Sequence, residues 1–546
     1  MITTKLKHAA LLAALSLALT GCFSGSPNPR TDGGGDGGGP TEPTDPVVVA
    51  PEQPEALAVV VNGNIVDAGT LNVLESATVS FRENGAASDS VATVNGEPVT
   101  QITVEEGSFS FTLRDGASPD VVRLLVTADG YFPKAFNIDF TSGEAEIESL
   151  LTLVAQAGDD VAVDSAEDDV TDATTGAAIT ATADSANAGA EATVPAGTQL
   201  RDSAGNAVTG TSVTLNVGAI NPQSNSSGSA IPDGLSSGVD GQVAVPVGVV
   251  DVTMRDNEGT NIKSFSNPIN VSMRLPASTL GPNGVDPIET GDEFQLSSFD
   301  EETGEWAIED TNAVVGALNG AGTAYTASFE TDHLTLFSAT ASSAVCTSAF
   351  LANNSGDTGG IGGYVLFKSS TGNTAQRLPR PFTSFTIPSI QLQRAGVSAT
   401  GQAEVSVIDP LGGIWYESDG LVQICGGTLN ARLVNPLATT FDEAVTVTAV
   451  CSNDDDVRTN VANAEVKYRE TGSGSIRATA RGVSGEVGSY QLVGLNADTD
   501  SYTVSVNPRL EGVAPFTQTI TPDGEDETIE FNITCPTVTG TGTGGG

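Results

Sequence analysis

The sequence predicts an all-β protein, built as a multi-domain string of antiparallel β-sandwiches behind a disordered N-terminal tether. Glycine is abundant, at 62 of 546 residues, and aromatic residues make up only 5% of the chain. This composition suits short strands joined by many turns. Long amphipathic helical patterns are missing, whereas apolar and polar residues alternate in many short segments, as they do in half-buried strands. The length favours several domains over one.

Residues 1–21 have the pattern of a bacterial lipoprotein signal peptide. Lys5 and Lys7 form a basic start, and the apolar run at 9–19 is too short for a stable membrane span. The run ends in Leu19-Thr20-Gly21-Cys22, which resembles the bacterial lipobox, where the cysteine thiol is lipidated and the preceding peptide is removed. The resemblance implies lipid attachment at Cys22. The alternative is a plain secretory signal with an incidental cysteine.

The residues after the lipobox predict where the protein is held. Residue 23 is Phe rather than Asp, and by resemblance to the enterobacterial sorting rule this implies an outer-membrane lipoprotein, periplasmic or surface-exposed. No later segment is apolar for long enough to cross a bilayer, so we expect the lipid to be the membrane anchor. Residues 22–55 are rich in Gly, Pro and acid, which predicts a disordered linker, and 537–546 predict a similar tail.

Two distant segments share an ordered series of strand patterns. "ESATVSFRENG" at 75–85 matches "ANAEVKYRETG" at 462–472, and "EEGSFSFTL" from 105 matches "EVGSYQLVGL" from 486. Three further strands follow in the same order in both segments. Within each strand, apolar residues fall on one face, and two such sheets have to bury these faces against each other. The repeat therefore predicts two related β-sandwiches.

The strand order and the phrase Gly-Ser-aromatic, Gly-Leu and Tyr-x-Val-x-Val resemble carboxypeptidase-regulatory-like domains. The resemblance covers 56–155 and 446–536. It implies prealbumin-like sandwiches, which are grouped with carbohydrate-binding-like folds. Members of the family serve mostly as spacers, stalks or binding accessories, so the resemblance implies a fold more than a function.

Residues 156–343 form a β-rich module of a different style. "FQLSSFDEETGEWAIED" and then "ASFETDHLTLFSAT" give an aromatic strand, a Thr-Gly turn, a Trp strand and a closing His-Leu-Thr-x-Phe strand. This series resembles the GAIN domain of adhesion receptors and the related modules of netrin receptors and ankyrins. Some of those modules cut their own chain between the Leu and the Thr. The cysteine pairs that brace the receptor motif are missing, because no cysteine lies between Cys22 and Cys346.

The resemblance makes His333, Leu334 and Thr335 candidates for autoproteolysis. His333 would take the hydroxyl proton of Thr335, whose oxygen would attack the carbonyl of Leu334, and the resulting ester would hydrolyse. The alternative, which we favour, is a strand end in which His333, Thr335 and Phe337 alternate with Leu334 and Leu336. His333 is the only histidine after the leader. We therefore expect no multi-histidine metal site, and any Ser-His-Asp triad would have to contain His333.

The four cysteines after Cys22 suggest two disulfides, since an even number in an exported chain is typical of a disulfide framework. We favour Cys451–Cys535, which open and close the second repeat. This choice leaves Cys346–Cys425, which bracket the third module. The other pairings stay open. No pair has the CxxC spacing of a zinc site, so we expect no metal there.

Residues 344–445 predict another β-sandwich module, with strands in "YVLFKSS", "FTSFTIPSIQLQ", "GQAEVSVIDP" and "GLVQICGG". Trp415 and Tyr416 follow a Gly-rich turn and are the candidate binding residues, because exposed aromatic rings stack on sugars. The alternative is that both belong to the core, and we favour the core.

The charge balance limits the partners. With 68 acidic and 22 basic residues, the chain repels phosphate backbones, so we expect no nucleic-acid partner. The acidic clusters at 159–160, 167–169 and 454–456 lack the spacing of a calcium loop, so we expect no cofactor, with calcium as the alternative. The sequence favours a non-catalytic, lipid-anchored surface protein with a structural, adhesion or ligand-binding role, whose ligand would be a surface protein or a polysaccharide. The alternatives are a carbohydrate-binding accessory lipoprotein and a self-cleaving protein cut between Leu334 and Thr335.

Overall fold

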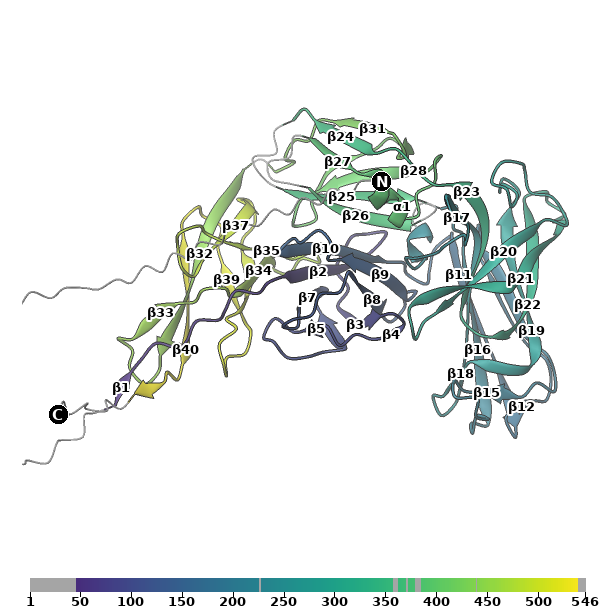
Figure 1. Cartoon of the computed structure of the whole chain (residues 1–546), viewed down its shortest axis with the longest axis horizontal. Coiled ribbons are helices and arrows are strands. Elements are labelled where there is room, and N and C mark those ends of the chain that lie inside the picture. Colours follow the sequence, from purple (N-terminus) through teal and green to yellow (C-terminus); the bar gives the residue numbers. More distant parts are fainter. Residues whose placement is uncertain are drawn as a thin grey trace, which may run out of the picture. The chain divides into compact units, whose positions relative to one another are not determined.

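The computed structural model describes residues 46–224, 227–356, 362–369, 372–378, 384–437 and 439–538 (Figure 1). Cys22 and the leader lie outside these residues. The described chain consists almost entirely of strands, and residues 48–536 form one compact unit. The predicted all-β fold of several sandwiches is confirmed. Among the described residues, no helix is long and apolar enough to cross a bilayer.

The first sandwich pairs two sheets around a buried core that includes Val79, Phe81 and Phe111. One sheet has the order β10-β2-β7-β5, with strands β2 (Val60–Asp67), β5 (Val91–Ala92), β7 (Ser108–Leu113) and β10 (Glu146–Leu153). The other has the order β4-β3-β8-β9, with strands β3 (Ser76–Glu83), β4 (Ala86–Ala87), β8 (Val121–Thr127) and β9 (Lys134–Asp139), and β6 (Gln101–Glu105) also pairs with β3.

The last sandwich repeats this topology. One sheet has the order β33-β32-β37-β36, with β40 on β32, built from β32 (Thr440–Cys451), β33 (Arg458–Asn460), β36 (Arg481–Gly482), β37 (Ser489–Asn496) and β40 (Glu527–Ile533). The other has the order β35-β34-β38-β39, built from β34 (Glu465–Glu470), β35 (Ala478–Thr479), β38 (Tyr502–Asn507) and β39 (Phe516–Ile520). In both sandwiches the final strand pairs in parallel with the first long strand, β10 with β2 and β40 with β32. Strand alternation alone did not predict this parallel pairing, because it carries no information on direction.

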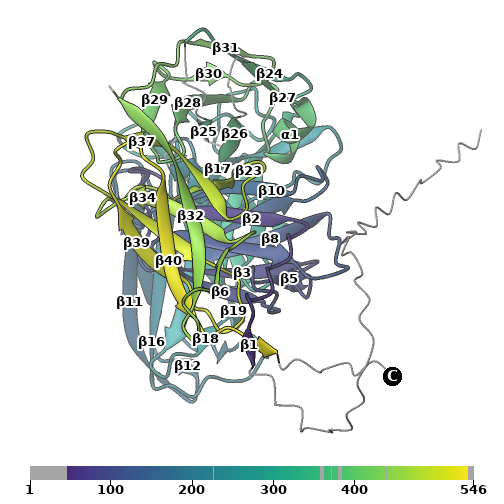
Figure 2. The same cartoon turned by 90° about the vertical axis from the view of Figure 1, so that its left-hand side faces the viewer.

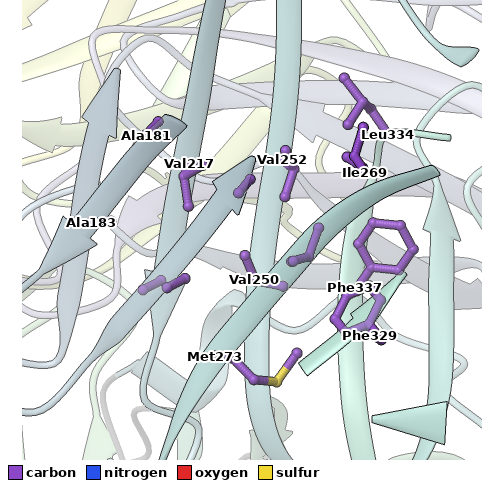
Figure 3. Packing of buried hydrophobic residues seen from close by; sticks show 14 of the residues in the cluster. Ala181, Ala183, Val217, Val250, Val252, Ile269, Met273, Phe329, Leu334 and Phe337 are labelled. Carbon is purple, nitrogen blue, oxygen red and sulfur yellow. The ribbon is translucent and has the colours of Figure 1, made fainter. Parts of the chain in front are cut away.

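The middle module is a single large sheet that packs against itself. Its order is β12-β11-β16-β17-β23-β20-β21-β22-β19-β14-β13, with β15 on β19 and β18 on β17. The strands are β11 (Val161–Thr171), β12 (Thr174–Thr175), β13 (Ile179–Asp184), β14 (Gly189–Val194), β15 (Leu200–Arg201), β16 (Ser212–Ile220), β17 (Gln242–Asp256), β18 (Asn261–Ile262), β19 (Ser264–Pro276), β20 (Glu293–Asp300), β21 (Glu305–Leu318), β22 (Ala324–His333) and β23 (Leu336–Ala344). Figure 3 shows part of its core, including Ala181, Val250 and Phe337.

The third module contains strands that were not predicted, and the strand predicted over 420–427 is reduced to Val422–Gln423. Its strands are β24 (Phe350–Asn354), β25 (Gly363–Ser369), β26 (Gly372–Leu378), β27 (Ser384–Ile387), β28 (Gln402–Ile408), β29 (Ile414–Glu417), β30 (Val422–Gln423) and β31 (Thr428–Ala431). The strand predicted over 382–393 is wrong beyond Ile387, because a short helix, α1 (Ser389–Arg394), follows. Pro388 sits at the helix start with φ −62°, where its missing N–H leaves no partner unsatisfied. Two short elements complete the inventory outside the large sheets: the 3₁₀ turn η1 (Ser227–Ala230) and the two-stranded sheet of β1 (Val47–Val48) and β41 (Thr537–Val538).

Two disulfides close the third module and the last sandwich. They are Cys346–Cys425, with a Cα–Cα distance of 5.5 Å, and Cys451–Cys535, with 5.3 Å. These are the pairs that the sequence favoured. Each closes a loop of about eighty residues, and the chain-entropy model assigns to such a loop about 4–5 kcal/mol of stabilisation, as an upper figure.

The modules within residues 48–536 share buried apolar clusters. The first sandwich and the middle module meet in a cluster that contains Leu125, Phe132, Phe299 and Leu336. The first sandwich, the third module and the last sandwich meet in a second cluster: Val66, Leu150, Tyr364, Leu366, Ile408 and Ile476. Figure 2 shows the strands of these modules from a second direction. Because apolar area is removed from water at these junctions, the modules stabilise one another.

One carboxylate links three modules. Glu148 on β10 has a side chain that is only 11% exposed. Its carboxylate lies 2.9 Å from Arg377 Nε and accepts a 3.4 Å hydrogen bond from the hydroxyl of Tyr364, both from the third module. It also lies 3.9 Å from Arg481 Nη2 of the last sandwich. A half-buried anion between two cations stabilises the fold only while all of these charged groups remain in contact.

The first and last sandwiches are also joined by direct hydrogen bonds. Asn64 pairs with the backbone of Arg477 in both directions, donating from Nδ2 to its carbonyl at 3.0 Å and accepting from its N–H at 2.9 Å. Lys467 Nζ donates to the Ser108 hydroxyl and to the Phe109 carbonyl, each at 3.0 Å. Glu106 pairs with the guanidinium groups of Arg469 and Arg477. The two copies of the repeat therefore bind each other.

Lys134 on β9 is an unusual core residue. Its side chain is 1% exposed, and its amine has no hydrogen-bond partner among the described residues. The Nζ atom lies 4.7 Å from the centroid of the Phe136 ring. Burial lowers the pKa of Lys134, and the charge of Asp233 opposes this shift only in part. An unpartnered buried amine costs stability.

We expect Glu148→Gln to lower the free energy of unfolding by about 1–3 kcal/mol, because Arg377 and Arg481 lose their shared anion. Calorimetric unfolding of the whole chain measures this change. Glu146→Gln is the matched control, since Glu146 is 31% exposed and pairs with Arg481 alone. Equal unfolding temperatures for the two variants would contradict the special role of Glu148.

We expect Lys134→Met to raise the free energy of unfolding by about 1–3 kcal/mol, because an apolar side chain of similar length replaces an unpartnered amine. The folded pKa of Lys134 is lowered, so the unfolded chain binds more protons and the wild type gains stability as pH rises toward its unfolded pKa. The variant should lose that pH dependence. Denaturant unfolding between pH 6 and pH 9 tests both statements, and a destabilised variant would refute them.

Candidate functional site

The predicted His-Leu-Thr motif lies in the connection between β22 and β23. β22 ends at His333 and β23 begins at Leu336, so the two residues between them form the turn. Leu334 and Thr335 are both buried. The Leu334 N–H donates to the Lys263 carbonyl at 3.2 Å, and the Thr335 carbonyl accepts from the Val252 N–H at 3.1 Å. Backbone hydrogen bonds on both sides therefore hold the turn.

The predicted base and nucleophile are not brought together. The Thr335 hydroxyl donates to the Phe299 carbonyl. His333 Nδ1 lies 3.1 Å from the Thr331 hydroxyl and 3.3 Å from Asp332 Oδ1, and its Nε2 lies 3.5 Å from Glu309 Oε1. Among the described residues, no hydrogen bond joins His333 to Thr335. The geometry matches the strand-end interpretation rather than an activated threonine.

Two cavities with shared lining residues lie beside the turn. The smaller, of ≈350 Å³, is lined by the His-Leu-Thr motif and by Asp300, Glu301 and Lys263. The larger, of ≈660 Å³, also contains Lys263, Glu301 and Leu334, and adds Asp251, Tyr131 and Phe132. Charged groups are therefore concentrated beside the motif and not within it.

Asp251 is the most perturbed of these groups. It lies on β17 between Val250 and Val252, which face the core of the middle module, so its side chain points to the opposite face. It is 8% exposed, and its Oδ1 atom has no hydrogen-bond partner in the described structure. Burial first, and then the charge of Glu301, raise the pKa of Asp251 to about 7, while Lys263 opposes the rise.

Gly218 lies next to both Asp251 and Phe132. A Cβ atom added to Gly218 on the neighbouring strand would lie 2.8 Å from the ring of Phe132 and 3.4 Å from Asp251 Cβ. Phe132 belongs to the first sandwich, so residues of two modules line the cavity beside Asp251. Only glycine at position 218 allows this approach.

Lys263 and Glu301 form an ion pair at the edge of the same cavity. Lys263 Nζ lies 3.1 Å from Glu301 Oε2, and both side chains are 22% exposed. Sequence reasoning did not select Asp251, Lys263 or Glu301. The available clue was the scarcity of lysine: only Lys134, Lys263, Lys368 and Lys467 follow residue 21. None of these four is exposed.

The structure places the candidate binding residues Trp415 and Tyr416 on β29, half-buried against the core of the third module. The Trp415 indole N–H donates to Asp409 Oδ2 at 3.2 Å. Burial raises the pKa of Asp409, and hydrogen bonds from the backbone of the same turn oppose the rise. The indole is therefore bonded to its own turn while its ring stays half-exposed, and sugar stacking by Trp415 and Tyr416 stays a prediction.

The acidic residues at 159–160 and 454–456 lie in turns, whereas those at 167–169 lie within β11. Asp160, for example, accepts hydrogen bonds from Asn187, Asn221 and Ser224. Within the described ranges, no group of three or more His, Cys, Asp or Glu side chains is arranged to hold a metal ion. Calcium binding stays an untested possibility of the sequence.

Comparison with known proteins identifies no family. No family model and no curated protein matches the chain. Among solved structures, the TIE protein of Bacillus anthracis aligns with 8% identity and a TM-score of 0.13, over 77% of this chain and 55% of that protein. The streptococcal ancillary pilin aligns with 14% identity and a TM-score of 0.15, over 45% and 93%. BcpA, the major pilin subunit of Bacillus cereus, aligns with 8% identity and a TM-score of 0.14, over 87% and 98%. At these scores the alignments carry no functional argument, and this chain spans about half the length of the first of these proteins.

We expect the purified chain to run as one band on a denaturing gel, because the Thr335 hydroxyl is bonded to Phe299 and not to His333. Thr335→Ala should leave this pattern unchanged and should lower the free energy of unfolding by about 1 kcal/mol, from loss of one buried hydrogen bond. Thr331→Ala is a control that removes the hydrogen bond to the His333 ring. Two wild-type bands, matching cleavage between Leu334 and Thr335 and lost in Thr335→Ala, would overturn the strand-end interpretation.

Proposed function

We propose that this protein is a lipid-anchored protein of the cell envelope that acts by reaching and holding rather than by catalysis. The observation that carries the proposal is the locking of the β-sandwich modules into one unit by shared apolar clusters and by the pairs around Glu148. Fixed modules suit a protein that transmits force or presents a binding surface. The role would be structural, adhesive or ligand-binding, with a surface protein or a polysaccharide as the ligand.

The chemistry of the described residues supports a non-catalytic role. An active site needs a base within hydrogen-bond reach of a nucleophile, or a metal in an open site. His333 faces Thr331, Asp332 and Glu309 and not Thr335. The role proposed here requires no cofactor.

The anchor and the location rest on the sequence. The lipobox at 19–22 supports lipidation of Cys22, and Phe23 supports transfer to the outer membrane. A flexible linker of about thirty residues spans on the order of 30 Å. That reach would hold the sandwiches clear of the lipid headgroups on either side of the outer membrane.

We expect Cys22→Ala to move the protein from the membrane fraction to the soluble fraction and to abolish labelling by a radioactive fatty acid, because the thiol is the acceptor of the lipid. Phe23→Asp is the matched control: it should keep the label and shift the protein to the inner membrane. Fractionation of envelopes in a bacterial host measures both. A Cys22→Ala protein that stays lipid-labelled and membrane-bound would refute the anchor.

A further inference from the structure

The outer face of the middle sheet changes from apolar to polar along three neighbouring strands. Val161 on β11, Ile220 on β16 and Val249 on β17 are paired in register and lie in the apolar cluster shared with the first sandwich. The next two rows on the same face, in the same strand order, are Val163, Gly218 and Asp251 and then Ser165, Asn216 and Thr253. Asp251 therefore lies at the boundary between a covered apolar row and a polar floor.

This polar floor belongs to the ≈660 Å³ cavity, and its lining carries an excess of negative charge. One wall is the loop of the first sandwich that contains Tyr131 and Phe132. The lining includes four carboxyl groups and two basic groups: Asp129, Asp164, Asp251 and Glu301, against Arg255 and Lys263. The cavity therefore attracts cations and repels anions.

Both basic side chains of the lining already have partners, whereas Asp251 does not. Lys263 Nζ lies 3.1 Å from Glu301 Oε2, and Arg255 Nε donates to Asn261 Oδ1 at 2.7 Å. Asp251 is 8% exposed, and no described residue forms a hydrogen bond with its Oδ1 atom. Because a buried carboxylate without a partner is costly, a positively charged donor placed in the cavity would offset that cost.

The surroundings of Asp251 suit an alkylammonium group and not a metal ion. A calcium ion takes several oxygen ligands, and no group of three or more acidic, His or Cys side chains in the described ranges is arranged to hold a metal. Phe132 and Asp251 both lie beside Gly218, and the Tyr131 side chain lines the same cavity. Aromatic rings attract ammonium groups, and Leu334 adds an apolar contact for a methylene chain.

We propose that this cavity binds a primary alkylammonium group, with Asp251 as its counter-ion. The ammonium donates to the Asp251 carboxylate, and the methylene chain lies against Phe132 and Leu334. Two sources carry this group, namely a lysine side chain of a partner protein and a free diamine. The inference names the ligand chemistry of the proposed holding role, and in that respect it rests on the proposed function.

Binding should depend on pH, because the group that receives the ammonium titrates near neutrality. Burial and the charge of Glu301 raise the pKa of Asp251 to about 7, and Lys263 opposes the rise. The ligand amine keeps its proton up to about pH 10. Tyr131 also keeps its proton, because burial and then Asp67 raise its pKa. Affinity should therefore rise as the pH increases through 7 and Asp251 becomes ionised.

Calorimetric titration of the purified full chain with cadaverine and with Nα-acetyl-lysine amide tests the proposal. Binding at pH 8 is expected, with an affinity about tenfold lower at pH 6, where most of Asp251 is protonated. Asp251→Asn should lower the affinity at pH 8 by about tenfold or more and should remove the pH dependence. Binding of cadaverine alone would assign the site to free diamines, and binding of both probes would fit a lysine side chain.

The controls separate a specific contact from general attraction by charge. Asp129→Asn removes one negative charge from an exposed position of the same lining and should change the affinity by less than about twofold. Nα-acetyl-norleucine amide has the same methylene chain without the amine and should not bind. Thermal unfolding checks that Asp251→Asn is folded, and if it is not, the pH dependence of the wild type decides.

Four results would overturn the proposal: no binding of either amine, equal binding of the norleucine compound, an affinity that does not change between pH 6 and pH 8, or equal losses in the two Asn variants. The titration does not depend on where the protein is found, so failure of the Cys22 experiment leaves it intact. Conversely, a chain that binds no amine could still be anchored and hold another ligand, so the two failures are distinguishable.

Discussion

The described unit depends on a scarcity of cations, and the contacts of the Glu148 carboxylate are the clearest example. A chain with 68 acidic and 22 basic residues has few cations with which to join its modules. Those cations are concentrated at the junctions. Arg377 and Arg481 meet at Glu148, Arg469 and Arg477 meet at Glu106, and Lys467 donates into the first sandwich. Acidic surfaces repel one another, so each junction between modules needs a basic side chain placed to offset that repulsion. The positions of a few arginines and lysines therefore determine most of the arrangement of the modules.

Strand alternation was enough to predict the sandwiches and the internal repeat, because period two is a local property of sequence. Val79 with Phe81 and Val466 with Tyr468 mark equivalent core strands in both copies. The parallel pairing of β10 with β2 could not be predicted from strand alternation. It depends on how the chain returns across the whole sandwich and not on either strand alone. The helix after Pro388 was missed for a smaller reason: apolar residues spaced over six positions fit a strand and a short helix equally well.

In the candidate site, too, the contiguous motif could be predicted from the sequence and the long-range contacts could not. The His-Leu-Thr motif is contiguous and was found, but its chemistry depends on which acceptor the Thr335 hydroxyl meets, and that acceptor, the Phe299 carbonyl, is 36 residues away. Asp251, Lys263 and Glu301 have no common motif, because their proximity arises from the hairpin of β17 and β18 and the end of β20. Residue scarcity is the one global feature of the sequence that points to them. Only four lysines follow residue 21 in this acidic chain.

The charged and the apolar contacts between modules have different roles in assembly. At an ionic strength of 1 M the Debye length falls to about 3 Å, so half-exposed pairs such as Arg481 with Glu146 lose most of their attraction. The clusters around Phe132 and Leu150 are not weakened by salt, because the hydrophobic effect does not depend on screening. The ion pairs then determine which modules meet and in what register, as charge complementarity does at other interfaces, while the apolar clusters hold them afterwards. We therefore expect the described unit to keep its geometry at high salt, because the apolar clusters still hold the modules together.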